Sequence, residues 1–400
     1  MSMTRPLKEP LSINFPKTGS ALSAEWERIC SSQSSRMNEL EEARQGIAEV
    51  DKEMAVLFEK RMRLAGKVLD YKKGNGLPIL DAAQEARVIA NNTDNISDPS
   101  IQEYYVLFLR DMMKISKAYQ GRLMNGMKIA YCGVPGAFAH IAAQTVFPEA
   151  DIVPYPDFES AYKACETGEA DTAVLPVENS FAGDVGGVMD LTFHGSLYIN
   201  LMLELDVSQN LLGLPGTHPE DIRTVLSHPQ ALAQCARFIT DRGLEAREFS
   251  NTAAAAKEVV RLGDKSIGAI ASRQTALLYG LEVLEPNINS AVANTTRFAV
   301  FSRARNKASL PETDGEHFIL VFTVRNEAGA LAKILNIIGS HGFNMSSLHS
   351  RPVAGPLWNH YFFAELEGGV ETENGRDLLR QLETVCDRLK MVGSYKSLKI

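Results

Sequence analysis

A long amphipathic stretch without proline, near the start of the chain, constrains the fold most strongly. Apolar side chains recur there with a heptad period, at Leu40, Ala43, Ile47, Val50, Met54, Leu57, Leu64, Val68 and Tyr71. The run from 36 to 73 ends at Gly74-Asn75-Gly76 and predicts one helix of roughly 55 Å, at 1.5 Å per residue. Such a helix is too long for a small lone domain, so we expect it to pair with a second copy of the chain.

Arg61 occupies one position of this apolar stripe. A guanidinium at an apolar seam needs an anionic partner, because a buried unpaired charge is very costly. Two interpretations stay open from the residues alone. The partner is either a carboxylate of the protein itself or an anionic ligand.

Two further helices are predicted after the glycine turn. One runs from Asp81, as N-cap, to about Asn92, with Gln84 in the capping-box position. The other runs from Pro99 to Gln120, with Asp98 as its N-cap. We therefore expect a three-helix unit over residues 35–124, preceded by a mobile tail over 1–34.

The third predicted helix carries a polar pair beside an apolar face. Ser116 and Gln120 lie four residues apart, so a helix places them side by side. The core stripe is expected at Ile101, Tyr105, Phe108, Met112, Ile115 and Tyr119. Polar groups next to a core stripe suggest a pocket.

Composition narrows the class of protein. With 400 residues, of which 45% are hydrophobic, the chain supports about two to four domains. No stretch has the roughly 20 uninterrupted apolar residues of a membrane span, and the start lacks a secretory signal, so we expect a soluble cytoplasmic protein. A formal charge of −8 argues against nucleic-acid binding. The five scattered cysteines predict free thiols, with no metal site, and no cofactor is expected.

Beyond Asn125-Gly126 the pattern changes to short apolar runs alternating with helical segments, which indicates α/β layers. The loop Gly133-Val134-Pro135-Gly136 precedes a helix expected from Ala137. It is similar to an anion cradle at a helix N-terminus but lacks the full spacing of a dinucleotide site. A small carboxylate is the expected guest.

Three polar loops follow strand-like runs, and such loops bind ligands in open α/β sheets. They are Glu178-Asn179-Ser180, Ser227-His228-Pro229-Gln230 and Thr295–Phe298. Thr296 offers a hydroxyl of restricted rotamer, and Arg297 a permanent cation suited to a carboxylate. The alternatives are a turn-forming Asn179, a helix-capping Ser227 and a surface His228, and for His228 the surface position is the favoured interpretation.

After a charged linker over 304–315, the order of expected elements is βαββαβ, over 316–400. The strands are expected at 317–324, 343–350 and 358–367, with a last short strand at the end. The helices are expected at 328–341 and near 375–390. This order is typical of an α+β, ferredoxin-like domain.

The helical segment resembles the chorismate mutase domain, an all-α dimer whose long helix helps build both sites. The positions that match its active-site residues are Arg44, Arg61, Lys72, Asp81, Glu85, Ser116 and Gln120. The resemblance implies that Arg44, from the partner subunit, and Arg61 hold the carboxylates of chorismate. Lys72 and Gln120 would face the ether oxygen, and Glu85 the ring hydroxyl. Gln84 stands where the family commonly has arginine.

Residues 127–303 resemble prephenate dehydratase, a fold of two α/β lobes of the type 2 periplasmic-binding kind with the site in the cleft. The matching positions are Asn179, Ser227, Gln234, Thr296 and Arg297, and Thr296-Arg297-Phe298 is the most specific tripeptide. The resemblance implies that Thr296 donates a proton to the leaving hydroxyl. Ala137 and Ala139 stand where relatives often have hydroxyl residues.

The terminal region resembles the ACT regulatory domain. The positions at which relatives bind phenylalanine are Gly329, Ala330, Leu331, Ser350, Arg351 and Pro352. His349 stands where the family usually has glutamate. The three resemblances together imply a homodimeric or larger enzyme of phenylalanine synthesis that converts chorismate to prephenate and then to phenylpyruvate, inhibited by phenylalanine. The competing interpretation is a non-catalytic amino-acid sensor.

Overall fold

The computed structural model describes residues 21–290, 294–305, 315–353 and 360–399, with side chains from Glu39 onward. It separates into two compact units, 1–78 and 79–400, which are described separately. Within the described residues, no helix is both long and apolar enough to cross a bilayer. The linker predicted at 304–315 falls mostly outside the described residues.

In the described part of the first unit, residues 21–78, one helix is present, α1 (Ala21–Gly74), of 54 residues. It begins well before the predicted start at about Arg36, so the helix extends into the region predicted as a mobile tail over 1–34. The reason is local, because no proline or glycine occurs between Ala21 and Gln45 to stop the helix. The heptad side chains are exposed in the single chain, with Ile47 63% and Leu57 62% exposed.

The second unit begins with α2 (Ala82–Thr93) and α3 (Gln102–Asn125). The predicted N-cap is confirmed, since the side chain of Asp81 accepts a hydrogen bond from the Gln84 amide at 2.9 Å. The start of α3 is later than predicted. Asp98 instead accepts hydrogen bonds from the amide and hydroxyl of Ser100 in a turn before the helix.

The buried face of α3 also differs from the prediction. Its buried residues are Leu109, Met113, Ser116 and Gln120. The expected core residues Ile101, Phe108, Ile115 and Tyr119 are between 38% and 49% exposed in the single chain. A helix with apolar residues around most of its circumference leaves the choice of inner face to its neighbours.

A first α/β lobe surrounds a mixed sheet. Its main strands are β1 (Lys128–Cys132), β2 (Asp151–Tyr155), β3 (Thr172–Asn179), β5 (Tyr198–Asp206) and β11 (Thr295–Ser302), in the order β5-β11-β3-β1-β2. Its helices are α4 (Phe138–Val146), α5 (Phe158–Thr167) and α6 (Gly186–His194). The central strand β3 is buried along most of its length, as a strand covered on both faces must be.

A second α/β lobe is inserted between β5 and β11. Its strands are β6 (Asn210–Gly213), β7 (Thr224–Ser227), β8 (Glu245–Glu248), β9 (Ile267–Ala271) and β10 (Glu282–Glu285), in the order β10-β6-β9-β7-β8. Its helices are α7 (Pro229–Gln234), α8 (Ala236–Asp241), α9 (Thr252–Leu262) and α10 (Arg273–Tyr279). The two lobes agree with the predicted two-lobe fold.

The terminal region confirms the predicted βαββαβ order. Its elements are β12 (Glu316–Thr323), α11 (Ala330–Ser340), β13 (Asn344–Pro352), β14 (His360–Glu367), α12 (Glu373–Glu383) and β15 (Arg388–Lys399). The predicted last helix is too long, because it ends at Glu383. The last strand, predicted to be short, has 12 residues.

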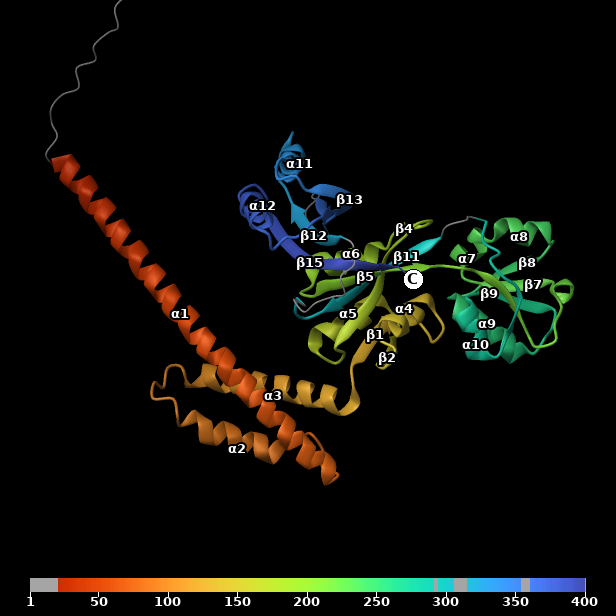
Figure 1. The fold of residues 1–400 in the computed structure, drawn as a ribbon, viewed down its shortest axis with the longest axis horizontal. Coiled ribbons are helices and arrows are strands. Elements are labelled where there is room, and N and C mark those ends of the chain that lie inside the picture. The colour runs from red at the N-terminus through yellow and green to blue at the C-terminus, as the bar shows by residue number, and fades with distance from the viewer. Residues whose placement is uncertain (1–20, 291–293, 306–314, 354–359, 400) are drawn as a thin grey trace, which may run out of the picture. The chain divides into compact units, whose positions relative to one another are not determined.

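The length of β15 joins the terminal region to the first lobe. Its early residues pair with β12, and its end pairs in parallel with β5 (Figure 1). In the pairing with β5, Ser397 lies opposite Met202. The strand order β13-β14-β12-β15-β5-β11-β3-β1-β2 is therefore continuous. Phe193 of α6 stacks on Tyr361 of β14, with ring centroids 4.3 Å apart. The terminal region and the first lobe thus share a hydrophobic core.

Candidate active and effector sites

A cavity of about 270 Å³ opens between the two α/β lobes. The first lobe contributes Cys132, Phe138, Asn179, Thr296 and others to its lining, and the second contributes Gln209, His228, Gln230, Gln234, Asn251 and Thr252. Because both lobes supply polar groups, a ligand there would contact both. The volume is near the lower end of typical small-molecule pockets, which begin at about 300 Å³.

Asn179 and Thr296 form the central polar contact of this cavity. They lie opposite each other on the antiparallel strands β3 and β11. The Nδ2 of Asn179 donates to the Oγ1 of Thr296 at 2.8 Å. Since the Thr296 oxygen accepts this hydrogen bond, its own proton is available to a ligand.

The orientation of the Asn179 amide is fixed by the backbone. Its Oδ1 accepts from the amides of Phe181 at 3.0 Å and Ala182 at 2.9 Å, and its Nδ2 also donates to Asn294 at 3.0 Å. Both side chains are buried, with Asn179 7% and Thr296 9% exposed. The cavity therefore presents a hydroxyl whose position and hydrogen bonding are set before a ligand arrives.

The cavity carries no ionic side chain, since none of the described residues that line it is Lys, Arg, Asp or Glu. Helix N-termini supply positive potential instead. Helix α4 starts at Phe138, next to Ala137, and no side chain caps it, so its first amides remain open to an anion. The preceding Gly136 has φ +89° and is held by Thr275, whose hydroxyl donates to the Gly136 carbonyl at 2.8 Å.

Three of the residues predicted for this site line the cavity, namely Asn179, Gln234 and Thr296. Two do not. The Ser227 hydroxyl is fully buried and donates to the Ile270 carbonyl at 2.6 Å. Arg297 lies on the other face of β11, because neighbouring residues of a strand point to opposite faces.

Residues that were not predicted as site residues complete the lining, two of them from the predicted loop Ser227-His228-Pro229-Gln230. His228, interpreted as a surface residue, lines the cavity and caps α7 by accepting from the Gln230 amide. Gln230 reaches Asn179 Oδ1 at 3.4 Å, and Gln209 donates to Gln234 at 3.3 Å. Glutamines on strand ends and short helices have no distinctive sequence signal. Burial raises the pKa of the Cys132 thiol to about 11, so this group is a neutral thiol and not a thiolate at neutral pH.

In the first unit, α1 carries three residues predicted for the helical site. Arg44 is exposed in the single chain, whereas Arg61 and Lys72 are half-buried. Burial lowers the pKa of Arg61, yet a guanidinium stays charged at any working pH. The helix therefore offers two partly desolvated cations.

In the second unit, the other four residues predicted for the helical site lie at the start of α2, within α2 and on α3. Asp81 caps α2, and Glu85 forms an ion pair with Lys117 at 2.8 Å. Ser116 donates to the Met112 carbonyl at 2.8 Å, and Gln120 is 7% exposed. Lys117 was not predicted, because a lysine on a polar helix face has no distinctive signal.

A cavity of about 310 Å³ lies in the terminal region. Its lining includes the predicted Ala330, Leu331 and Ser350, together with Arg325, Asn326, Glu327, His360 and Phe362. The predicted Gly329 lies immediately before Ala330 in the chain. It is the N-cap of α11 and has φ +84°. Two predicted residues lie elsewhere. Arg351 binds Asp190 of α6, and Pro352 is exposed at the end of β13.

Comparisons with known proteins agree with this three-part organisation. Family models match residues 43–121 (chorismate mutase type II), 129–306 (prephenate dehydratase) and 318–384 (ACT domain). A bifunctional chorismate mutase/prephenate dehydratase of Enterobacter agglomerans is 30% identical over 375 residues, covering 90% of this chain and 96% of that protein.

Two solved structures are similar to about two thirds of the chain. Prephenate dehydratase of Arthrobacter aurescens in complex with L-Phe is 28% identical, has a TM-score of 0.61, and covers 67% of this chain and 89% of its own. GqqA, described as a novel type of quorum quenching acylase, is 34% identical, has a TM-score of 0.62, and covers 68% of this chain and 98% of its own.

Proposed function

Because the chain belongs to the bifunctional chorismate mutase/prephenate dehydratase family, we infer that it rearranges chorismate to prephenate and then converts prephenate to phenylpyruvate in phenylalanine synthesis. The ACT domain adds feedback regulation by phenylalanine. The observation that carries the second activity is the buried Asn179–Thr296 hydrogen bond in the cavity between the lobes.

In the dehydratase site, Thr296 is the proposed proton donor. Loss of carbon dioxide sends the electrons of the broken C–C bond into the ring, and the ring hydroxyl departs as water. The Thr296 proton passes to that hydroxyl while Asn179 donates to the threonine oxygen and stabilises the charge left there. Threonine is a weak acid, so the rate depends on this fixed arrangement in a site with little water.

The carboxylates of prephenate are proposed to be seated by neutral groups. The open amides of α4 at Phe138 and Ala139 suit one carboxylate, and the side-chain amides of Gln230 and Gln234 contribute from the second lobe. Ser227 has a structural role in this proposal, since its hydroxyl is already used by Ile270.

In the mutase site, the proposed residues are those of the family resemblance. Rearrangement of chorismate needs no nucleophile, only a compact substrate and cations near the ether oxygen. Arg61 and Lys72 supply the cations, while Glu85, Ser116 and Gln120 supply hydrogen-bonding groups. Arg44 would come from a partner subunit. The exposed heptad stripe of α1 supports a homodimer, because so many apolar side chains are unfavourable in water.

The effector site is proposed at the cavity of the terminal region, with Ala330, Leu331 and Ser350 contacting phenylalanine. Gly329 allows close approach of the ligand to the start of α11. The cytoplasm is the proposed compartment, in keeping with the free thiols of Cys165 and Cys235.

Incubation of the purified protein with chorismate tests the proposal. Chorismate should be consumed and phenylpyruvate should accumulate, with prephenate as a transient intermediate. A non-catalytic sensor would bind phenylalanine but leave chorismate and prephenate unchanged. That result would contradict the proposed enzymatic activities and favour the sensor interpretation.

A further inference from the structure

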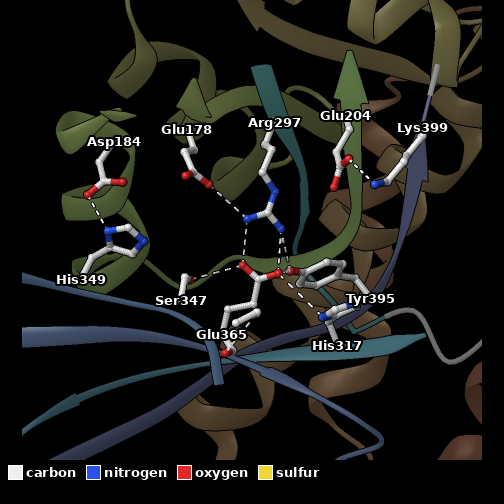
Figure 2. A network of polar contacts seen from close by, with 11 residues as sticks. Glu178, Asp184, Glu204, Arg297, His317, Ser347, His349, Glu365, Tyr395 and Lys399 are labelled. Carbon is white, nitrogen blue, oxygen red and sulfur yellow. Dashed lines mark hydrogen bonds and ion pairs between the residues drawn. The ribbon is translucent and has the colours of Figure 1, made fainter. Parts of the chain in front are cut away.

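Arg297, the residue after the proposed proton donor, links three strands of the continuous sheet. Its guanidinium forms two parallel hydrogen bonds with Glu365 of β14, from NH1 to Oε2 at 2.8 Å and from NH2 to Oε1 at 2.7 Å (Figure 2). NH1 also contacts Glu178 of β3 at 3.2 Å. One side chain therefore binds a carboxylate of the terminal region and a carboxylate of the first lobe.

The Arg297–Glu365 pair is enclosed. Glu365 is 3% exposed, and the Tyr395 hydroxyl donates to its Oε1 while accepting from Arg297 NH2 at 3.2 Å. Burial raises the pKa of Glu365, but the hydrogen bonds and the charge of Arg297 outweigh burial and lower the pKa overall. The pair stays ionised throughout the working pH range, and buried bidentate pairs of this kind hold a strict geometry.

The contact of Arg297 with Glu178 lies next to the proposed proton donor in the β11–β3 ladder. Thr296 is opposite Asn179 and Arg297 is opposite Glu178 in the β11–β3 ladder. The guanidinium thus fixes the strand ends on one face of the sheet, while Thr296 and Asn179 meet on the other. The ladder shifts register between Arg297 and Phe298, so the backbone pairing alone holds this end less firmly.

We propose that Arg297 is a positioning residue of the dehydratase, and that Glu365 of the terminal region completes the active site by holding Arg297 against Glu178. Thr296 and Asn179 then keep the separation needed for proton donation. A misplacement of about 1 Å costs about a hundredfold in rate, so a side chain that never touches the substrate can control turnover.

The position of Glu365 also suggests how an effector acts. His360 and Phe362, which line the cavity of the terminal region, lie on β14 together with Glu365. A ligand that moves this strand changes the grip of Glu365 on Arg297. This part of the inference rests on the proposed phenylalanine site, whereas the positioning role does not.

A second ion pair between the same two regions provides a matched control. Arg351 binds Asp190 through two hydrogen bonds of 2.9 and 2.8 Å. Asp190 lies on α6, and neither Asn179 nor Thr296 belongs to that helix. Asp190 also accepts from the Tyr361 hydroxyl of β14 at 2.8 Å. Asp190→Asn therefore weakens the docking of the terminal region, β14 included, without removing a hydrogen bond of Arg297 or touching β11.

The experiment compares Glu365→Gln with Asp190→Asn in the full chain. We expect Glu365→Gln to lower dehydratase kcat by about tenfold to a hundredfold, with KM for prephenate and mutase turnover changed by less than about threefold. It should also weaken phenylalanine inhibition. Asp190→Asn should leave dehydratase kcat within about twofold of the parent, even if it lowers the melting temperature as much as Glu365→Gln does. Equal losses of kcat in both variants would overturn the inference.

A double variant tests whether Arg297 and Glu365 affect turnover through the same contact or independently of each other. It also provides a second test if Glu365→Gln alone folds poorly. If the two residues act as one unit, Arg297→Gln with Glu365→Gln should be no slower than Arg297→Gln alone, within about threefold. If the double variant loses kcat by the product of the two single-variant losses, the inference is contradicted. Turnover of the parent protein tests the proposed function itself, whereas the ratios between variants test only the positioning role.

Discussion

The side chains of Thr296 and Arg297 leave β11 on opposite faces, Thr296 into the cavity with Asn179 and Arg297 onto Glu365 of the terminal region. This alternation gives two adjacent residues different work. Thr296 lines the cavity between the lobes, and Arg297 ties the strand to the ACT domain. The proposed proton donor and the contact with the terminal region therefore lie on a single strand, and Figure 2 shows the contacts of Arg297 with Glu178 and Glu365.

The mutase assignment predicts that Arg61→Ala abolishes chorismate rearrangement while added prephenate is still converted to phenylpyruvate. The lost charge-assisted contact should cost several kcal/mol in the transition state, since such bonds are worth about 1.5–3 kcal/mol even when averaged over proteins. Rates of both reactions in the same preparation check this. Mutase turnover within about tenfold of the parent would remove Arg61 from the site.

The effector assignment predicts that Gly329→Val releases the dehydratase from phenylalanine. Gly329 has φ +84°, a conformation that a β-branched residue strongly disfavours, so the first turn of α11 must shift at the cavity. Inhibition should weaken by about five- to 150-fold, the usual range of allosteric coupling, with turnover unchanged.

Gly342→Val is the control for this variant. Gly342 lies just beyond the other end of α11 with φ +71°, so its replacement adds similar backbone strain away from the cavity. In phenylalanine titrations, Gly342→Val should be inhibited as strongly as the parent protein. Identical responses in all three proteins, or no response of the parent at millimolar phenylalanine, would place the effector elsewhere.

The continuous sheet predicts that Gly393→Ala damages the joint between β15 and β5. A Cβ at this position would lie 2.0 Å from the Ile199 carbonyl oxygen, which belongs to the backbone and cannot move aside cheaply. We expect the variant to lower the free energy of unfolding by about 1–3 kcal/mol and to reduce dehydratase activity, while mutase activity is kept. Gly339→Ala, where the added Cβ meets nothing within 4 Å, is the control. Equal melting temperatures for both variants would show that the joint is not tight.

Lys390 predicts a pH dependence of stability. Burial lowers the pKa of Lys390 to about 8, and the nearby charge of Arg388 lowers it further. The ammonium donates to the carbonyls of Thr192 and Gly195, which offsets only part of the cost of burying its charge. An unfolded lysine has a pKa of about 10.4, so between the two values the unfolded chain binds more protons. The contribution of this residue to the unfolding free energy therefore rises with pH across that window and is most unfavourable below it.

Denaturant unfolding of the parent and of Lys390→Met across this window measures the effect. The stability difference between the two proteins should shift in favour of the parent as the pH rises. Parallel curves would show that Lys390 has the same proton affinity in both states.

Local patterns made much of the fold predictable. The heptad stripe predicted α1, the strand-like runs before two of the polar loops predicted β3 and β7, and the order of elements predicted the terminal domain. Strand β8, Glu245–Glu248, was missed because all four residues are exposed, so no apolar period marks it.

The relation between distant segments was not predictable. The sequence places Arg297 next to Thr296, but its partner Glu365 is 68 residues away and depends on the register of β14 and β15. Likewise, His228 resembles any exposed histidine until the second lobe brings it to the cavity. Long-range packing decides such contacts, and no local pattern encodes them.

Thr296→Val tests the central claim most directly, because it removes the hydroxyl while keeping the branched shape. Parent and variant are incubated with chorismate, and chorismate, prephenate and phenylpyruvate are quantified over time. The account predicts that the variant consumes chorismate at the parental rate, accumulates prephenate and forms phenylpyruvate more slowly by about 10²-fold or more. Phenylpyruvate formation at the parental rate would contradict Thr296 as the proton donor and, with it, the proposed dehydratase site.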